Sequence, residues 1–455
     1  MSSTICTVAV SQQEGRAVTM TRALSKALQL SGGRTILLRI GSKSVNVPLK
    51  LVNRAGLICT MSAPVAASLR LPWRGKCMIR NVGNRELQIG PLIGILTNTL
   101  PGSANPFGSR SGFVREFMHT CHGKAFYIGF SPGQVDWEEE VVVGYVPGEG
   151  GRWVRKTTPL PDVVYNRLTS RTAEKSMSMD QFKNRFVRRK IPFFNWSFFD
   201  KWDVYRLLQG EEINRHVPDS INSPKTEDIQ RMLEKHRFVY LKPTAGSLGI
   251  GIYRLTYNPG RGYFARFHRG GTNMLLRFPR FEGLVSLLQR HNVRLVNYVV
   301  QQGIRLIEID NCPIDFRFHM MKNGNNQWVP VGIGAKKAGR GSVTTHVRTG
   351  GQLMTPEYVL GRAFGGKADQ LLQNAKDVSV KLAEAIEKNY PHSLVELGFD
   401  LGIDQNERVW MFEANAKPGR SIFKHPSLKA QGKATFTHLL DHILYVSRFR
   451  ARRDS

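Results

Sequence analysis

The stretch Glu396-Leu-Gly-Phe-Asp400, followed along the chain by Glu413-Ala-Asn415-Ala-Lys-Pro418-Gly419, is the part of the sequence that best defines the fold. Between the two runs lies Asp404-Gln-Asn-Glu407, a cluster of turn-forming residues. We therefore expect a hairpin of two strands, Leu394–Ile403 and Arg408–Asn415. Such a hairpin would bring the acids of both runs to one place.

Oxygen-bearing side chains in this hairpin favour a metal site. Asp400 and Glu413 can face each other across the two strands, and Asn415 shares a face with Glu413 because strand side chains alternate. Two carboxylates and an amide oxygen are hard ligands that suit Mg²⁺ carrying phosphates. The alternative is a solvated turn with incidental acids. The apolar run Val409–Phe412 argues against it, because an acid in an apolar strand is costly without a partner.

Further towards the N-terminus, Phe238-Val-Tyr-Leu-Lys242 has the pattern of a strand that ends in a lysine. The loop after it contains Gly246, Ser247, Gly249 and Gly251. Glycine lets backbone N–H groups approach an anion closely, and the lysine adds a full positive charge. The segment is a candidate phosphate-binding loop. It lacks the Gly-Lys-Ser/Thr of a Walker A motif, and a structural hairpin turn is the alternative.

Composition excludes several classes of protein. With 65 basic and 35 acidic residues, the 455-residue chain has a formal charge of +30. At 41% hydrophobic residues it is too apolar for a disordered polybasic tail. No apolar run reaches the about eighteen residues of a membrane span, and Met1–Gly15 lacks the basic leader of a secretory signal. Five scattered cysteines indicate free thiols, so we expect a soluble intracellular protein.

The chain divides into four segments by composition and element pattern. Residues 1–90 are predicted to be a basic, β-rich module. Residues 91–195 alternate strands and helices in the order of a small, mostly parallel sheet. Residues 196–447 have the pattern of a larger α+β domain, and residues 448–455 are a basic tail that we expect to be frayed. No internal repeat is apparent.

Basic residues are concentrated near the N-terminus. Residues 1–130 contain sixteen Lys and Arg residues and three acids. A surface of this kind favours polyanions such as nucleic acid or an acidic polymer. A solvated basic face without a specific partner is an equally good interpretation.

The combination of a Lys-Pro strand end, a glycine-rich loop and a distant Asp…Glu-x-Asn-x-x-Pro-Gly resembles the ATP-grasp superfamily. More closely, the chain resembles the YheC/YheD group, the endospore coat-associated ATP-grasp proteins of spore-forming Bacillus-type bacteria. The resemblance implies an α/β and α+β architecture: an ATP-grasp fold with a pre-ATP-grasp βα domain and an N-terminal β-rich module. It also implies that the cofactors are ATP and Mg²⁺.

The resemblance assigns roles to residues that match the family motifs. Asp400, Glu413 and Asn415 match the Mg²⁺ ligands, and Arg317 and Arg348 match arginines that meet phosphate or act in catalysis. In relatives that form amides, the stretch around Arg348 is Asn-x-x-Arg-Gly-Gly, whereas this chain has an inserted Thr349 and no such asparagine. Many relatives have glutamate where this chain has Gln302. The implied nucleotide-binding residues are Lys201, Lys242, Gly246, Ser247, Gly249, Gln301, Gln302 and Asp315.

The chemistry implied by the resemblance is carboxylate activation. An acidic carboxylate substrate attacks the γ-phosphate of Mg-ATP to give an acylphosphate, which an amine acceptor converts to an amide. The implied setting is the mother-cell cytoplasm or the spore coat. Two alternatives remain open: a non-catalytic ATP-binding or structural spore-coat protein, and a polyanion-binding protein that uses the basic N-terminal module.

Overall fold

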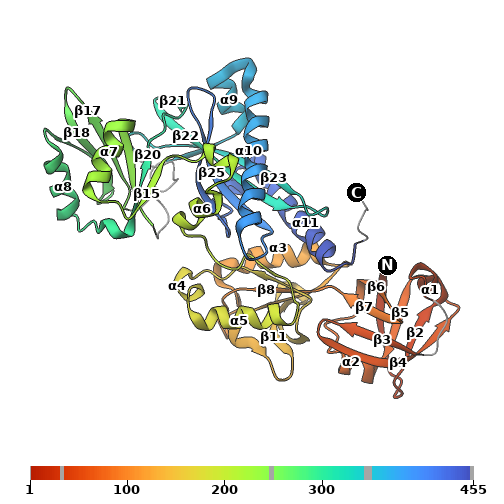
Figure 1. The fold of residues 1–455 in the computed structure, drawn as a ribbon. Helices are drawn as coiled ribbons and strands as arrows, with labels where there is room; N and C mark the ends of the chain where they lie inside the picture. Colours follow the sequence, from red (N-terminus) through yellow and green to blue (C-terminus); the bar gives the residue numbers. More distant parts are fainter. Residues whose placement is uncertain (1, 31–34, 245–250, 343–350, 451–455) are drawn as a thin grey trace.

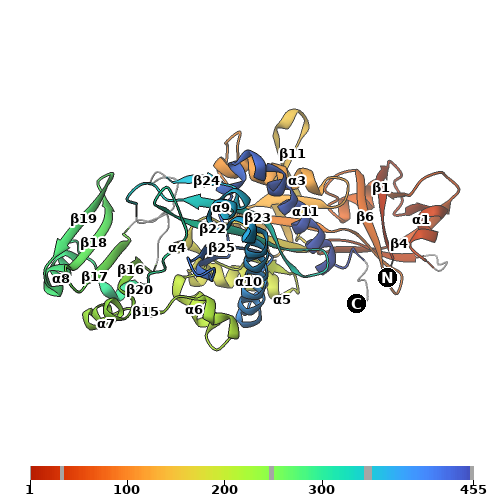
Figure 2. The same ribbon diagram turned by 90° about the horizontal axis from the view of Figure 1, so that it is seen from above.

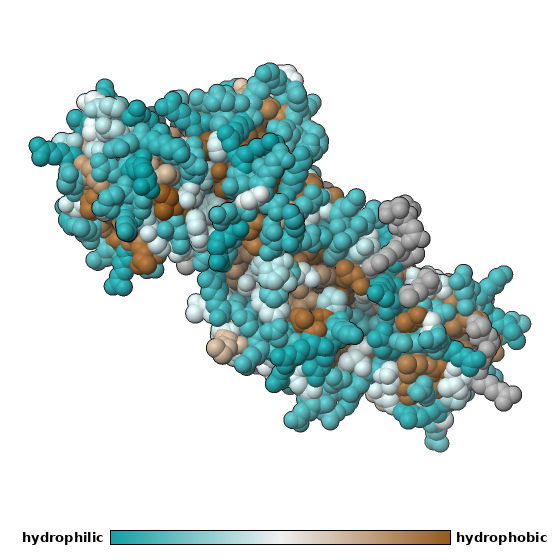
Figure 3. Space-filling view, in the orientation of Figure 1, coloured by the Kyte–Doolittle hydropathy of each residue, from teal (hydrophilic) through white to brown (hydrophobic). Residues whose placement is uncertain are grey.

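The computed structural model describes residues 2–30, 35–244, 251–342 and 351–450. Three parts follow one another through an elongated molecule: an N-terminal barrel, a middle α/β layer, and a C-terminal part with two sheets (Figures 1 and 2). Hydrophilic residues cover most of the face seen in Figure 3, and its hydrophobic residues form separate patches. Within these ranges, no helix is long and apolar enough to cross a membrane.

Residues 3–90 form a closed barrel in the order β1-β5-β2-β4-β3-β7-β6. Alternate side chains point inward and form its core, which includes Cys6, Cys59 and Cys77. All five cysteines of the chain are buried and free, as the sequence predicts. The elements are β1 (Ser3–Ser11), β2 (Val18–Thr21), α1 (Arg22–Ala27), β3 (Thr35–Ile40), β4 (Lys43–Val52), β5 (Ile58–Ser62), α2 (Ala63–Ser68), β6 (Gly75–Gly83) and β7 (Glu86–Gly90).

The barrel contains an internal repetition that is not apparent in the sequence. The order strand, helix, strand, strand occurs first as β2-α1-β3-β4 and again as β5-α2-β6-β7. Of the three parallel pairs, β3 with β7 joins the two halves, β2 with β4 lies within the first half, and β1 with β5 joins the first strand to the second half. A repeated topology with little shared sequence is possible because a barrel requires only alternating inward apolar residues.

The middle part is a seven-stranded sheet in which β9, β8, β13 and β14 are parallel neighbours, whereas β10, β11 and β12 pair antiparallel, so the predicted mostly parallel sheet is confirmed for the first four strands. Phe186 of α5 packs on one face, and α3 packs on the other. The elements are β8 (Leu92–Leu96), α3 (Ser111–Cys121), β9 (Phe126–Phe130), β10 (Val135–Asp136), β11 (Val141–Pro147), β12 (Trp153–Pro159), β13 (Val163–Asn166), α4 (Arg171–Glu174), α5 (Met177–Arg188) and β14 (Phe193–Phe194).

The first sheet of the C-terminal part, the small sheet, has the order β15-β20-β16-β17-β18-β19. Helices α7 and α8 cover one of its faces with residues such as Leu233 and Leu284, and the other face carries polar side chains. The elements are β15 (Ser220–Asn222), α7 (Thr226–His236), β16 (Phe238–Pro243), β17 (Tyr253–Asn258), β18 (Gly262–Arg269), β19 (Thr272–Phe278), α8 (Phe281–Arg290) and β20 (Tyr298–Gln302).

The second sheet, the large sheet, has the order β24-β23-β22-β25-β26, with β21 beside β22. The predicted hairpin is present as β25 and β26. The long helix α10 packs on one face through residues such as Leu382. The elements are α6 (Lys201–Leu208), β21 (Glu308–Ile309), β22 (Cys312–Lys322), β23 (Trp328–Lys337), β24 (Gln352–Met354), α9 (Pro356–Phe364), α10 (Ala368–Asn389), β25 (Glu396–Ile403), β26 (Val409–Asn415) and α11 (Lys429–Val446).

The end of the chain ties the three parts together. Helix α11 packs against α3 of the middle sheet, where Phe436 stacks on Phe117. Just beyond it, Phe449 is fully buried beneath the Arg80 guanidinium of the barrel, 5.1 Å from its ring centre. Ser3 Oγ donates a 2.6 Å hydrogen bond to the Phe449 carbonyl. The expectation of a frayed tail is therefore wrong for Arg448–Arg450, because the Phe449 ring is buried against the barrel.

Candidate functional site

The large sheet places its charged side chains on one face. In β22 the run Ile314–Met320 alternates apolar and polar residues, so Phe316 and Phe318 enter the core under α10 while Asp315 and Arg317 point the other way. Strand register sets Arg317 opposite Asp400 and Asp315 opposite Lys336. In the hairpin, Asp400 is opposite Glu413, as the sequence predicts, and Gly398 is opposite Asn415.

Asp400 is held by two cations. Arg317 donates from Nε and Nη2 to the two carboxylate oxygens, each at 2.8 Å. Lys336 Nζ lies 2.9 Å from Asp400 and 2.9 Å from Asp315. Burial disfavours the charged form of Asp400, but Arg317 and then Lys336 outweigh it and hold the pKa of Asp400 well below its usual range. The same contacts raise the pKa of Arg317 and of Lys336 against the effect of burial, so all three groups are charged at neutral pH.

Glu413 and Asn415 have side-chain oxygens that form no hydrogen bond within the described part of the chain. Both side chains are partly exposed on the same strand. The described residues contain no group of three His, Cys, Asp or Glu side chains arranged for a metal. The donor set is two carboxylates and one amide, which fits a hard cation that also takes oxygens from a phosphate ligand.

The small sheet contributes Lys242 from the opposite side. Lys242 Nζ donates a 2.5 Å hydrogen bond to Gln301 Oε1 and lies 5.8 Å from the ring centre of Phe412, the neighbour of Glu413 in β26. Gln301 Nε2 in turn donates to the hydroxyl of Tyr205 in α6. Burial raises the pKa of Tyr205 to about 12, with a smaller contribution from Glu413. These contacts show that the two sheets face each other across the candidate site.

A row of side chains continues this surface over the small sheet. Strand register aligns Gln301, Tyr240, Arg254 and Arg266 across four neighbouring strands, on the face away from α7 and α8. Arg254 and Arg266 therefore add two cations to the face that carries Lys242. The sequence prediction missed both of them and Tyr205. The alternation of apolar and charged residues in Tyr253–Asn258 and Gly262–Arg269 is the signal that could have identified the two arginines.

One predicted residue does not join the site. Gln302 follows Gln301 in β20, so its side chain points to the opposite face of the strand. Its Oε1 accepts a 3.1 Å hydrogen bond from the backbone N–H of Asp219. Gln301 lies beside Lys242, whereas Gln302 is bound to the loop before β15.

Of the predicted site residues, four lie outside the described ranges, and a fifth is described by its backbone alone. Lys201 is the first residue of α6, and its side chain is not described. Gly246, Ser247, Gly249 and Arg348 lie outside the described residues.

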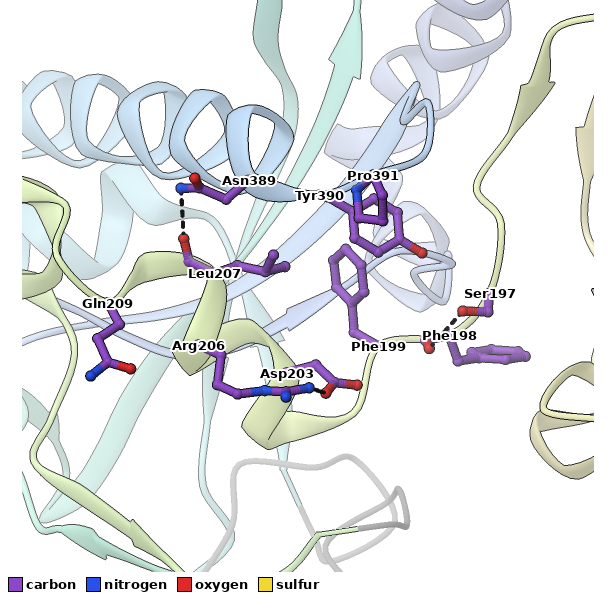
Figure 4. A pocket seen from close by; sticks show the side chains of 10 residues that line it. All are labelled: Ser197, Phe198, Phe199, Asp203, Arg206, Leu207, Gln209, Asn389, Tyr390 and Pro391. Atoms are coloured by element: carbon purple, nitrogen blue, oxygen red, sulfur yellow. Dashed lines mark hydrogen bonds and ion pairs between the residues drawn. The ribbon is translucent and has the colours of Figure 1, made fainter. Parts of the chain in front are cut away.

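A hollow of about 420 Å³ lies on the other side of α6 (Figure 4). Helix α6 contributes Asp203 and Arg206 to it, and Phe199 packs edge-on against Tyr390 at its wall. None of its lining residues belongs to the predicted site. The candidate site is instead the polar space between the two sheets.

The chain is similar to known proteins in both sequence and structure. A model of the YheC/D-like ATP-grasp family matches residues 190–446. The endospore coat-associated protein YheD of Bacillus subtilis (strain 168) is 34% identical over 386 residues, which cover 83% of each chain. The solved D-alanine–D-alanine ligase of Bacillus anthracis is 12% identical with a TM-score of 0.45, covering 78% of this chain and 97% of the ligase.

Proposed function

The chain belongs to the YheC/D-like ATP-grasp family, and we propose that it is a Mg-ATP-dependent carboxylate–amine ligase that acts through an acylphosphate. The observation that carries the proposal is the pairing of two polar faces. Lys242 and Gln301 of the small sheet lie opposite the Asp315, Arg317, Lys336 and Asp400 cluster of the large sheet. Cations on both sides with oxygen ligands between them suit a polyphosphate and its metal.

The proposed reaction has two steps. A substrate carboxylate oxygen attacks the γ-phosphorus of ATP, and the bond to the ADP oxygen breaks as the acylphosphate forms. An amine then attacks the carbonyl carbon, loses a proton and displaces phosphate, leaving the amide. Each step moves negative charge onto phosphate oxygens, which fixed cations stabilise without reorganising.

The residues of the candidate site have distinct roles in this scheme. Lys242 binds the nucleotide phosphates, as we also propose for Lys201 and for the loop with Gly246, Ser247 and Gly249. Gln301 positions the Lys242 ammonium. Asp315 and Asp400 hold Lys336 and Arg317 in place. Arg348 is proposed as a second catalytic arginine beside Arg317.

Asp400, Glu413 and Asn415 would hold Mg²⁺. When bound, the ion neutralises phosphate oxygens during transfer. Asp400 already contacts two cations, whereas Glu413 and Asn415 form no hydrogen bond with any described residue, so their oxygens are the more readily available ligands.

Calorimetric titration with a non-hydrolysable ATP analogue, with and without Mg²⁺, tests the nucleotide site. We expect saturable, Mg²⁺-dependent binding that Lys242→Ala abolishes. Lys26→Ala, which removes an exposed lysine from α1 of the barrel, is the matched control and should bind normally. Absence of binding at millimolar nucleotide would refute the proposal and favour a structural protein that retains the fold.

We also propose that the chain acts in spore formation, in the mother cell or at the coat. The support is the 34% identity to YheD, whose name places that relative at the endospore coat. Fluorescence of a tagged copy during sporulation of its host checks this. Signal that stays unchanged and diffuse in vegetative and sporulating cells alike would contradict it.

A polyanionic partner is the second candidate function. Of thirteen Lys and Arg residues in residues 1–90, nine are exposed, whereas Glu14 is the one exposed acid of that segment's described residues. Such a surface is expected to bind acidic polymers in a salt-dependent way. Binding to a model polyanion such as polyphosphate that does not weaken between low and high salt would contradict it.

A further inference from the structure

The last three strands of the small sheet lie in a segment whose charged residues are all arginines. Between Gly251 and Phe281, which includes β17, β18 and β19, the sequence contains six arginines and no acidic residue. A surface with this composition attracts anions. The six are Arg254, Arg261, Arg266, Arg269, Arg277 and Arg280.

Two of these arginines lie directly opposite each other on the face away from α7 and α8. Strand register pairs Arg254 with Arg266. Neither guanidinium forms a hydrogen bond or ion pair within the described ranges. Arg254 Cζ lies 4.5 Å from the ring centre of Phe238, and Arg254 Nε is buried without a hydrogen-bond partner among the described residues. Like charges directly opposite on neighbouring strands repel, so an anion bound between them would be stabilising.

Exposure increases along the row of side chains that contains this pair. The row begins in β20 with Gln301, which is 1% exposed. The two arginines are partly exposed, and the row ends in the edge strand β19 at Leu275, which is opposite Arg266 and 56% exposed. Strand β19 lies at one end of the molecule (Figure 2). With about 4.8 Å between neighbouring strands, the row runs roughly 19 Å from the inner part of the candidate site to solvent.

The face that carries this row touches the large sheet on both sides of the arginine pair. At the β20 side, Lys242 Nζ lies 5.8 Å from the ring centre of Phe412. At the β19 side, Asn273 Nδ2 donates a 3.3 Å hydrogen bond to the carbonyl of Arg340, which follows β23. Leu275 lies two residues beyond Asn273 and remains exposed, so the row is open to solvent beside this contact.

We propose that Arg254 and Arg266 bind carboxylates of the acidic substrate, a peptide or other chain with several carboxylate groups that enters over β19. This inference rests on the proposed function, since the carboxylate that is activated would lie deeper in the same site. Guanidinium groups bind carboxylates through paired, charge-assisted hydrogen bonds. The arginines lie two and three strands from Gln301, about 10 and 14 Å across the sheet. A chain with several carboxylates therefore fits the row better than a single small acid.

A fluorophore placed beside the arginines distinguishes binding at this row from binding at the basic barrel. Leu275→Cys accepts an environment-sensitive dye, and the five native cysteines are buried, so labelling is confined to position 275. We expect hexaglutamate, but not hexaglutamine, to change the fluorescence with Mg²⁺ and ADP present. Adding Arg266→Gln should raise the half-saturating hexaglutamate concentration about tenfold, because one charge-assisted contact is lost.

Arg269→Gln is the matched control. Arg269 is exposed at the end of the same strand, three residues beyond Arg266, so its side chain points to the opposite face. This variant removes the same charge and should keep the half-saturating concentration within twofold.

Four results would overturn the inference: no response to hexaglutamate, an equal response to both peptides, a response that ignores Arg266, or an equal loss in the Arg266 and Arg269 variants. Calorimetry with the ATP analogue adds a fifth. If Arg266→Gln weakened analogue binding as much as peptide binding, Arg266 would belong to the nucleotide phosphates.

The same calorimetry separates the two proposals. If wild type binds nucleotide and the peptide response ignores Arg266, only this inference fails. If wild type binds no nucleotide, the proposed function fails, whereas a peptide response that depends on Arg266 would still show an anion site at this row.

Discussion

Glu413 and Asn415 are the residues of the candidate site that the folded protein itself needs least. Neither forms a hydrogen bond within the described ranges, and both are partly exposed. We expect Glu413→Gln combined with Asn415→Ala to weaken Mg²⁺-dependent nucleotide binding by at least about tenfold, because one carboxylate charge and one amide oxygen ligand are lost. The thermal unfolding midpoint should stay within a few degrees of wild type.

The control lies in the same hairpin but away from this face. Asn406→Ala with Glu407→Gln changes the turn between β25 and β26 and should leave nucleotide binding unchanged. Calorimetry measures the affinity, and circular dichroism follows unfolding. Undiminished affinity and Mg²⁺ dependence in a folded Glu413/Asn415 variant would remove both residues from the metal site.

Glu396 makes stability depend on pH in the acid range. Burial alone would raise its pKa, but Arg167, with His319 and Tyr165, lowers the pKa of Glu396 to about 2. Because the native state then binds fewer protons than the unfolded chain, this contribution is present above pH 4.5, the ordinary value, and is lost as pH falls towards 2. It amounts to about 3 kcal/mol.

The unfolding midpoint measured from pH 7 to pH 3 tests this effect. We expect wild type to lose stability below about pH 4.5. We expect Glu396→Gln to be less stable than wild type at pH 7 and to lose less stability than wild type as the pH falls. Glu138→Gln, an exposed glutamate, should follow wild type. If the Glu396 variant lost as much stability at acid pH as wild type does, the acid sensitivity would belong to other carboxylates, such as Asp400.

Sequence reasoning succeeded at residues whose position depends on local alternation. Asp400, Glu413 and Asn415 follow from one hairpin, and register confirms their placement. Gln301 and Gln302 were both predicted to bind the nucleotide. Their side chains point to opposite faces of β20, because a one-residue step along a strand moves a side chain to the other face. Tyr205 could not be foreseen, since it reaches Gln301 from a helix almost a hundred residues away in sequence.

At the scale of elements, the close contact between Pro418 and Gly398 keeps the loop after β26 near the large sheet. A Cβ added at Gly398 would lie 2.5 Å from Pro418 Cβ, closer than carbon atoms can approach. We expect Gly398→Ala to cost about 1–3 kcal/mol by displacing this loop. Urea unfolding measures the loss.

Gly361→Ala in α9 is the matched control. A Cβ there meets nothing within 4 Å, so the change should stabilise the helix by up to about 1 kcal/mol. If both variants were equally stable, the contact between Pro418 and Gly398 would not constrain the loop.

Elements were predicted well where their pattern is local. The predicted strands Leu394–Ile403 and Arg408–Asn415 are present as β25 and β26 with closely similar bounds. The sequence analysis did not predict the short helices α1 and α2, because six residues are too few to show the repeat of apolar residues that marks a helix. Closure of the barrel was missed for another reason: its parallel pairs join strands far apart in sequence, and the repetition is one of topology rather than of residues.

At the scale of the whole molecule, Phe449 connects the segment after α11 to the barrel. It is fully buried beneath Arg80, and Gly90 lies against its ring edge. The barrel has a second attachment, in which Asp162 accepts from Gln88 Nε2 at 2.6 Å and from the Leu92 N–H at 2.7 Å. The barrel is thus fixed to the remainder from two sides, by the middle sheet and by the end of the chain.

Phe449→Ala should therefore loosen one of the two attachments without unfolding the barrel core. Removing a buried phenylalanine costs about 3–5 kcal/mol, and the cost falls on the contact between the barrel and the C-terminal end. We expect faster amide hydrogen exchange at β1 and β6, which adjoin this contact, and nucleotide binding close to wild type. Tyr358→Ala, which removes an aromatic ring that is 51% exposed, is the control. Uniformly faster exchange throughout the molecule would instead make Phe449 part of one cooperative core, so that the barrel could not move independently of the site.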